Sequence, residues 1–576
     1  MAVEKLITDH IDIWSSALQT RSMAGRGSNG KIDLYGIKKL RELILELAVR
    51  GKLVPQDLND EPASELLKRI AAEKAELVKQ GKIKKQKPLP EINEDEKPFE
   101  LPKGWEFMRM DHVGHDWGQK APENDFTYID VGSINKELGT ISEPGVINPK
   151  DAPSRARKIV RRNTVLYSTV RPYLLNIAVV DEDYDPEPIA STAFAIIHPW
   201  NGISSTFIYH YLRSPIFVSY VESCQTGIAY PAINDKQFFT GVIAIPPVEE
   251  QLRIVSKVNE LMSLCDQLEQ KSLSSLDAHQ QLVETLLATL TDSQNAEELA
   301  ESWARISQHF DTLFTTEASI DALKQTILQL AVMGKLVPQD PNDEPASELL
   351  KRIEQEKAQL VKEGKIKKHP PVEPLGEPAL LPRSWLNIVV QDFADIRLGS
   401  TPDRSEKKYW NGDIPWVSSG EVANEVILDT KEKITPEGFK NSSTSMIPTG
   451  SLLMAIIGQG KTRGQTAILG IDACTNQNVA AFVFNQVLVE PEYVWIWAKS
   501  KYLSHRGDGH GGAQPALNGK KVRSFIFPLA PIKEQQRIVS EVKRLNDICD
   551  TLQSRLQSAQ QTQLHLADAL TDAALN

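Results

Sequence analysis

Apolar positions recur at helical spacing near the end of each half of the chain. They follow one another at intervals of four and three residues, the heptad pattern of helices that pack along a shared apolar stripe. The first stripe consists of Ile254, Val258, Leu261, Cys265 and Leu268, and the second of Ile538, Val542, Leu545, Cys549 and Leu552. We predict two long helices with apolar seams. The seams require partners, which are either the two helices themselves or helices of another subunit.

Strand-like runs precede each long helix. They read TVLYSTV (164–170) and NIAVV (176–180) in the first half, and SLLMAII (451–457) and VAAFVF (479–484) in the second. Their β-branched and aromatic content is typical of strands. Further upstream, Leu66, Leu67, Ile70, Leu77 and Val78 form a helical apolar stripe, with Pro62 or Pro345 in the first turn of the helix. Basic, proline-containing linkers follow, at 82–90 and 365–374.

The same blocks occur twice in the same order. The stretch GKLVPQDLNDEPASELLKRI (51–70) returns at 334–353 with one change, and 32 of the 38 positions in 48–85 match 331–368. The block PPVEEQLRIVSKV (246–258) likewise corresponds to APIKEQQRIVSEV (530–542). A period of this length indicates tandem duplication of a large unit. The segments between the blocks have similar lengths but different sequences, which predicts one fold carrying two different recognition surfaces.

These patterns predict an α/β (α+β) multidomain chain with a pseudo-twofold internal duplication. We expect two globular mixed domains separated by the two long helices, together with repeated helical inserts. The predicted segments are helical 1–100, mixed 101–245, long helix 246–300, helical 301–380, mixed 381–529 and long helix 530–576.

Composition narrows the class of protein. A chain of 576 residues is too long for one core. The net charge of −11 argues against a protein that coats nucleic acid indiscriminately, although local basic surfaces remain compatible with it. Four cysteines with no close pair indicate a reducing, cytoplasmic setting and no metal cage. We see no apolar run long enough to span a membrane, and no signal peptide.

Motifs for catalysis are weak. GQGKTRG (458–464) lacks the first glycine of a phosphate-binding loop, because Ala455 stands there. His112 and His115 have no second cluster that would complete a metal site. We find no nucleophile elbow and no dinucleotide fingerprint. The sequence therefore predicts a chain without its own catalytic site and without a cofactor of its own.

Basic and polar residues gather in acid-free stretches at matching places in both halves. Arg and Lys bind phosphates, while Arg, Gln, Asn and Ser can read base edges. The candidate DNA-binding residues are Lys158, Arg161, Arg162, Tyr167, Ser168, Arg171, Tyr173, Tyr230, Asn234, Lys236, Ser418, Ser419, Gln459, Lys461, Thr462, Arg463, Gln514, Asn518 and Lys520. The alternatives are a solvated charged face and, for the loops GIAYPAIN (227–234) and GGAQPALN (511–518), a turn that merely closes the domain.

The blocks resemble the specificity subunits of type I restriction-modification systems, and the long helical insert resembles the enterobacterial type IB subgroup. The resemblance rests on GSTPDRSEKKYWNGDIPWVSSGEV (399–422), VLYSTVRPYLLNIAVV (165–180), IASTAFAII (189–197) and the two closing blocks. It covers nearly the whole chain.

The resemblance implies a DNA-binding subunit of an antiviral restriction system. Each of two target-recognition domains would read half of a bipartite, asymmetric DNA site, and the long helices would form an antiparallel coiled coil that sets the distance between the halves. Two modification subunits would bring S-adenosylmethionine and adenine methylation. Two restriction subunits would bring ATP- and Mg²⁺-dependent cleavage. The alternative hypotheses are a helical protein-binding scaffold without DNA readout and an enzyme with an unrecognised site.

Overall fold

The structure is a computed structural model that describes residues 3–21, 31–83, 89–227, 231–458, 462–502, 504 and 517–575. The chain forms two compact units, and each is considered by itself. Unit 1 comprises residues 1–19, 33–273 and 560–576, and unit 2 comprises 20–32 and 274–559. No helix in the described ranges combines the length and apolar character needed to cross a membrane.

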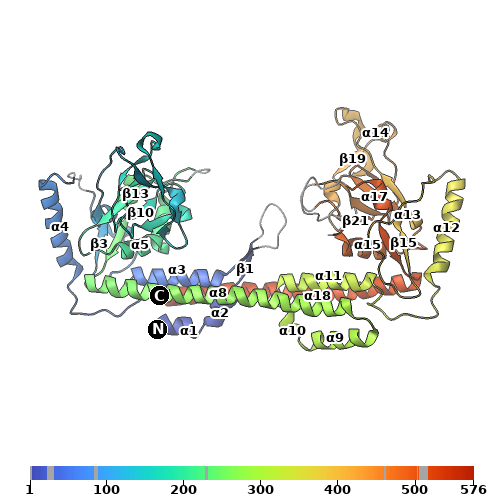
Figure 1. The fold of residues 1–576 in the computed structure, drawn as a ribbon, viewed down its shortest axis with the longest axis horizontal. Helices are drawn as coiled ribbons and strands as arrows, with labels where there is room; N and C mark the ends of the chain where they lie inside the picture. Colours follow the sequence, from blue (N-terminus) through green and yellow to red (C-terminus); the bar gives the residue numbers. More distant parts are fainter. Residues whose placement is uncertain are drawn as a thin grey trace. The chain divides into compact units, whose positions relative to one another are not determined.

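Unit 1 combines a sheet region with helices that lie beside and beneath it (Figure 1). Its helices are α1 (Val3–Thr8), α2 (Ile11–Ser16), α3 (Tyr35–Val49), α4 (Ala63–Lys79), α5 (Ser205–Arg213), α6 (Pro215–Cys224), α7 (Asp235–Thr240) and the first part of α8 (Val248–Asp292). Helix α3 packs against α5, which covers the sheet. Salt bridges of 2.6 Å from Arg41 to Asp266 and Glu269 join α3 to α8.

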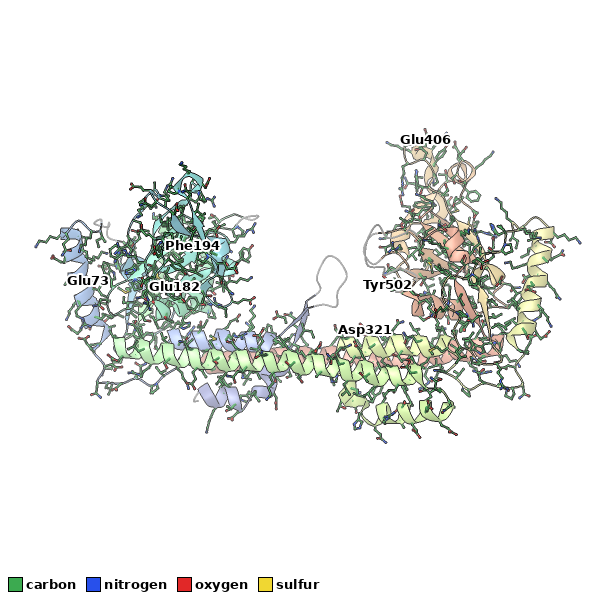
Figure 2. The ribbon with its side chains drawn as sticks, viewed as in Figure 1. Glu73, Glu182, Phe194, Asp321, Glu406 and Tyr502 are labelled. Atoms are coloured by element: carbon green, nitrogen blue, oxygen red, sulfur yellow. The ribbon has the colours of Figure 1, made fainter. Side chains whose placement is uncertain are left out.

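The strands of unit 1 form two four-stranded sheets and two pairs. They are β3 (Glu106–Arg109), β4 (Gly114–His115), β5 (Phe126–Ile129), β6 (Ile134–Asn135), β7 (Thr140–Ile141), β8 (Gly145–Ile147), β9 (Ala156–Ile159), β10 (Val165–Ser168), β11 (Ile177–Val179), β12 (Pro188–Ser191), β13 (Phe194–Pro199) and β14 (Val242–Ile245). The sheet orders are β11-β10-β13-β4 and β8-β5-β12-β9, with β3 paired to β14 and β6 to β7. Figure 2 shows Phe194 in the middle of this region, where it is fully buried.

Unit 2 repeats this plan. Its helices are α9 (Ala296–Gln308), α10 (Phe310–Leu313), α11 (Glu317–Val332), α12 (Ala346–Lys362), α13 (Val390–Phe393), α14 (Pro436–Lys440), α15 (Pro491–Ser500), α17 (Gly519–Arg523), the last part of α8 and the first part of α18 (Ile532–Leu575). Helix α11 packs against α15, as α3 packs against α5. One apolar cluster takes residues from α8, α11 and α18, including Leu287, Leu323 and Val542.

The strands of unit 2 fall into a five-stranded sheet, a three-stranded sheet and a pair. They are β15 (Leu386–Val389), β16 (Asp395–Leu398), β17 (Trp410–Val417), β18 (Val426–Ile427), β19 (Glu432–Ile434), β20 (Leu452–Ala455), β21 (Thr466–Leu469), β22 (Cys474–Thr475), β23 (Val479–Val483) and β24 (Ile526–Leu529). The sheet orders are β16-β23-β20-β21-β18 and β19-β17-β22, with β15 paired to β24. A separate pair joins β1 (Gln19–Arg21) to β2 (Lys31–Asp33).

The two units share a strand order. The run β11-β10-β13-β4 corresponds to β21-β20-β23-β16, and β8-β5-β12 corresponds to β19-β17-β22. Directions agree as well, because β12 pairs with β5 and β22 with β17 in parallel, whereas the other pairs in these runs are antiparallel. The segments 164–170 and 451–457 therefore contain equivalent strands, β10 and β20, each of which has a neighbouring strand on both sides.

The predicted elements are present, with one adjustment. All four strand-like runs contain strands, and both heptad stretches lie in helices of 45 and 44 residues. Leu268, Leu545 and Leu552 are half-buried, while the other seam residues are buried. Pro62 and Pro345 were predicted inside the first turn of α4 and α12, but each is the extended N-cap residue that precedes it.

A glycine in each repeated stretch lies where a side chain does not fit. Gly51 has a φ of +67°, and a Cβ there would lie 2.5 Å from Pro102 Cγ and 2.9 Å from Trp105 Cζ2. A Cβ at Gly334 would approach Pro382 and Trp385 in the same way. The repeated stretch thus approaches the turn before β3 or β15 too closely for any other residue.

We predict that Gly51→Ala destabilises unit 1 more than Gly81→Ala. Both glycines have left-handed backbones, at φ +67° and +71°, but no atom lies within 4 Å of a Cβ at Gly81. The strain common to both costs about 1–2 kcal/mol, and the overpacking specific to Gly51 adds about 1–3 kcal/mol. Urea unfolding followed by hydrogen exchange of unit 1 peptides measures the difference. Equal losses would show that the close approach at Gly51 is unimportant.

Candidate nucleic-acid interface

Two loops that the sequence analysis considered separately lie side by side in unit 1. The loop after β10 and the segment before α7 pair through a bridge between Val170 and Ala232. The Arg171 N–H donates to the Pro231 carbonyl at 2.8 Å, and the Ile233 N–H donates to the Thr169 carbonyl at 3.0 Å. Backbone hydrogen bonds therefore hold the two candidate loops together as one surface.

This surface carries four exposed candidates, Arg171, Tyr173, Asn234 and Lys236, which we call the tip patch. Tyr173 keeps 49% of its surface exposed, a large fraction for an aromatic side chain. Arg171 has a φ of +50°, in the left-handed region that non-glycine residues seldom adopt. Strained backbone of this kind is held only where surrounding contacts enforce it, and it concentrates at functional sites. A cation beside an exposed aromatic ring is suited to phosphate binding and base stacking.

Arg161 and Arg162 lie on the turn before β10. Arg161 is exposed and stacks on the Trp117 ring, with its Cζ 4.1 Å from the ring centroid. Arg162 is exposed and lies 3.8 Å from Asp183 Oδ2, a separation that solvent screens strongly. Both guanidinium groups therefore face solvent and are sterically available to a phosphate backbone.

Three further candidates in unit 1 are buried, which argues against direct contact with DNA. Tyr167 is 2% exposed and packs on Phe217 and Phe238, and burial raises the pKa of its phenol. Ser168 is 1% exposed and donates to the Val170 carbonyl. Lys158 is 5% exposed, with its Nζ 3.3 Å from Asp235 Oδ2. Strand β10 is covered on both faces, so polar residues within it point into packed interior.

Asn234 and Asn518 have the same structural role in the two units. Asn234 Oδ1 accepts from the Gln237 N–H at 2.9 Å at the start of α7, and Asn518 Oδ1 accepts from the Lys521 N–H at 3.0 Å at the start of α17. Each is an N-cap, which satisfies a helix N–H that lacks an intrahelical partner. These bonds use the side chains that were predicted to contact DNA, so their capping role competes with that prediction. Lys236 and Lys520, two residues later, are exposed.

The remaining candidates in unit 2 are less accessible. Ser418 Oγ donates to Glu421 Oε2 at 2.8 Å in the turn after β17, and Ser419 is half-buried. Thr462 is half-buried, and Arg463 is 8% exposed. Four predicted residues, Tyr230, Gln459, Lys461 and Gln514, lie outside the residues that the structure describes. Their predicted contacts with DNA stay predictions.

A basic and aromatic group in unit 2 was missed by the sequence analysis. The Arg404 guanidinium lies 4.1 Å from the Trp410 ring centroid and 5.2 Å from that of Trp416, and it pairs with Glu432. Glu406, labelled in Figure 2, lies at the outer end of the same segment of unit 2. The signal was the interleaving of basic and aromatic residues in RSEKKYW, which was read only as part of the resemblance.

Of the two histidines considered as metal ligands, His115 lies in an aromatic cluster. The His115 ring lies 4.5 Å from Trp117, 5.3 Å from His198 and 4.8 Å from Trp200. Burial, with smaller contributions from His115 and Arg161, lowers the pKa of His198 to about 4, so its imidazole is neutral at pH 7. Within the described ranges, no three His, Cys, Asp or Glu side chains gather in a way that could hold a metal ion.

Comparison with known proteins identifies the family. Residues 382–560 match the family model described as the type I restriction modification DNA specificity domain. The chain is 48% identical to the type I restriction enzyme EcoAI specificity subunit of Escherichia coli, with both chains covered completely. This chain belongs to the type I restriction enzyme specificity subunits. The EcoEI specificity subunit of the same species is also 48% identical over the full length of both chains.

Membership in the specificity subunits confirms the family predicted from the sequence, including its enterobacterial subgroup. It also supports the prediction that this chain confers specificity and is not itself catalytic. A chain from a solved structure titled for complex assembly and conformational transition of the type I R-M system matches with a TM-score of 0.51. That match has 22% identity and covers 83% of this chain and 99% of the other, so it supports the mixed α/β fold alone.

Proposed function

We propose that this specificity subunit recognises a bipartite, asymmetric DNA site, with one half read by the sheet domain of each unit. The observation that carries the proposal is the shared strand order of the two units, combined with different loop sequences beyond the equivalent strands β10 and β20. One scaffold thereby presents two different surfaces. Family membership supports the DNA-reading role.

The proposal includes a tandem duplication and an antiparallel coiled coil of α8 and α18. Unit 1 contains the beginning of α8 and the end of α18, while unit 2 contains the end of α8 and the beginning of α18. In unit 1 the Tyr35 hydroxyl of α3 donates to Asp568 of α18 at 2.7 Å, and in unit 2 Lys324 of α11 pairs with Asp550 of α18 at 2.7 Å. Antiparallel helices place the beginning of one helix beside the end of the other, so opposite ends of α8 and α18 are expected in the same unit. Helices α3 and α11 also pack against the long helices, so they cover part of the apolar seams of α8 and α18.

The partners in the proposal are two modification subunits and two restriction subunits. S-adenosylmethionine, ATP and Mg²⁺ would be bound by those partners. Two nearly identical segments containing α4 and α12 support this stoichiometry, because two copies of one partner require two equivalent surfaces. The mass of the assembled methyltransferase complex tests it, and a single modification subunit per chain would contradict it.

Alanine substitution of the tip patch distinguishes DNA reading from a purely protein-binding scaffold. We expect Arg171→Ala and Lys236→Ala to weaken DNA binding by the assembled complex roughly tenfold each, because each would remove a charged hydrogen bond to phosphate. The slope of log affinity against log salt should fall by about one per substitution. Titrations at several salt concentrations measure both quantities.

The matched control is Lys271→Ala, which removes an exposed lysine from α8 outside the tip patch. It should leave the affinity and the salt slope unchanged. If both tip variants bind as tightly as the unmodified complex, the scaffold hypothesis gains support and the tip patch has no role in DNA binding.

A further inference from the structure

The first two turns of each long helix carry the same three polar residues. In α8 they are Glu250, Gln251 and Arg253, which we call the 250 triad; in α18 they are Glu534, Gln535 and Arg537, the 534 triad. All four Glu and Gln residues are at most 1% exposed. Polar groups buried to this extent cost free energy unless they are hydrogen-bonded, so their bonding partners reveal their role.

The glutamates bind the repeated stretch. Glu250 accepts from Gln56 Nε2 at 2.6 Å and from Trp105 Nε1 at 3.0 Å. Glu534 accepts from Gln339 Nε2 at 2.6 Å. Burial raises the pKa of both carboxyl groups, while the neighbouring tryptophan and glutamine act in the opposite direction. The bonds that oppose the desolvation therefore come from the segments that pack against each helix.

The glutamines bind the sheet domain. Gln251 Oε1 accepts from the Ser204 N–H at 2.8 Å, and its Nε2 donates to the Pro246 carbonyl at 3.1 Å. Gln535 Oε1 accepts from the Glu490 N–H at 2.9 Å, and its Nε2 donates to the Ala530 carbonyl at 2.8 Å. Ser204 and Glu490 are the N-cap residues of α5 and α15. Each glutamine therefore joins the long helix to the start of the helix that covers the domain's sheet.

The arginines complete the attachment. Arg253 Nη2 lies 2.5 Å from Asp60 Oδ2, and Arg537 Nη2 lies 2.6 Å from Asp343 Oδ2. The two aspartate side chains are only 8% and 4% exposed. The hydrogen bonds that both arginines donate to these carboxylates raise the pKa of the guanidinium groups. The repeated stretch thus supplies a glutamine and an aspartate to each triad, and every triad residue has a defined partner.

We propose that the two triads are positioning residues that hold each sheet domain at a fixed angle on its own long helix and thereby enforce the spacer length of the DNA site. This inference rests on the proposed function. One base pair advances the duplex by about 3.4 Å and turns it by about 35°, since a turn takes 10–10.5 base pairs. A domain that rocks on its helix can compensate for such a step, whereas a domain held by a triad with two buried side chains cannot.

The test measures methylation of DNA substrates by the assembled methyltransferase complex. The substrates keep both half-sites and differ only in spacer length, which is native or changed by one or two base pairs. The spacer ratio is the rate on an altered spacer divided by the rate on the native one. For Gln251→Ala and Gln535→Ala, each of which removes at least two hydrogen bonds of a buried side chain, we expect this ratio to rise at least about fivefold.

Leu252→Ala and Gln536→Ala are the matched controls. These residues lie within the same helical turns, between the glutamine and the arginine, and are exposed. Their spacer ratios should equal that of the unmodified complex. If Gln251→Ala fails to assemble, Arg253→Lys and Arg253→Ala carry the test. The lysine retains the charge opposite Asp60 and should raise the ratio about twofold, while alanine should raise it further.

A uniform fall in rate at every spacer length, with the ratio unchanged in all triad variants, would overturn the proposal, because the triads would then serve stability alone. The outcome is separable from failure of the proposed function. If the unmodified complex shows no spacer preference, bipartite recognition itself is wrong. If it is strict and the triad variants are equally strict, only the positioning role is wrong.

Discussion

Replacing residues 101–245 with the corresponding segment of the EcoAI specificity subunit should change one half of the methylated site and leave the other half intact. The segment contains every strand from β3 to β14, and with it the whole sheet domain of unit 1. The pairing of β3 with β14 lies inside the exchanged segment, so the graft preserves its own closing strand pair. Methylation sequencing of the genome in cells carrying the hybrid and its partners gives the new motif.

The reciprocal exchange of residues 381–529 is the matched control. It transfers β15 to β24, which also pair with each other, and should change only the other half-site. A hybrid that alters both halves at once, or neither, would contradict the assignment of one half-site to each domain. The 250 and 534 triads lie outside both segments, but their partners Trp105, Ser204 and Glu490 lie inside, so each grafted segment has to supply equivalent contacts to the long helices.

Removing one heptad from both long helices should shorten the spacer by about three base pairs and leave both half-sites unchanged. We choose residues 270–276 of α8 and 556–562 of α18, because these stretches include the points where the chain passes from one unit to the other. Seven residues of helix span about 10 Å, and one base pair spans about 3.4 Å. A deletion of seven keeps the heptad phase, so the buried seam residues on either side stay in register.

A deletion of four residues from each helix is the control for this experiment. It disrupts the heptad phase and should reduce assembly or activity instead of giving a clean new spacer. Methylation sequencing compares the gap between the half-sites in each case. An unchanged gap after the seven-residue deletion, with active complex, would contradict the proposal that the paired helices set the spacing.

The elements that could be predicted from sequence are those with a strong periodic pattern. The heptads at 254–268 and 538–552 lie in long helices, and the apolar runs around β10 and β20 are central strands. The family was predictable because blocks such as PPVEEQLRIVSKV recur in fixed order. The structural reason why these blocks recur could not be predicted. It depends on the hydrogen-bond partners of Glu250 and Gln251, which come from segments about 50 to 200 residues away.

The candidate interface was predicted less well, because composition does not distinguish a side chain that faces DNA from one that faces its own backbone. Asn234 is followed three residues later by Gln237, which is a capping-box spacing that the sequence already displayed. Lys158 alternates with half-exposed neighbours along β9, and its ammonium group pairs with Asp235, which lies far away in the sequence. Arg171 and Lys236 are exposed, and only the tertiary pairing of their loops brings them to one surface, while their contacts with DNA stay predictions.

The most direct measurement of the central claim is methylation sequencing of genomes from cells that carry the partner subunits with and without this chain. The account predicts methylated adenine in a gapped, asymmetric motif, with two short specified halves and a fixed spacer, that appears only when the chain is present. Methylation that is unchanged by the chain, or a single continuous motif, would contradict the proposal that its two units read two halves of one site.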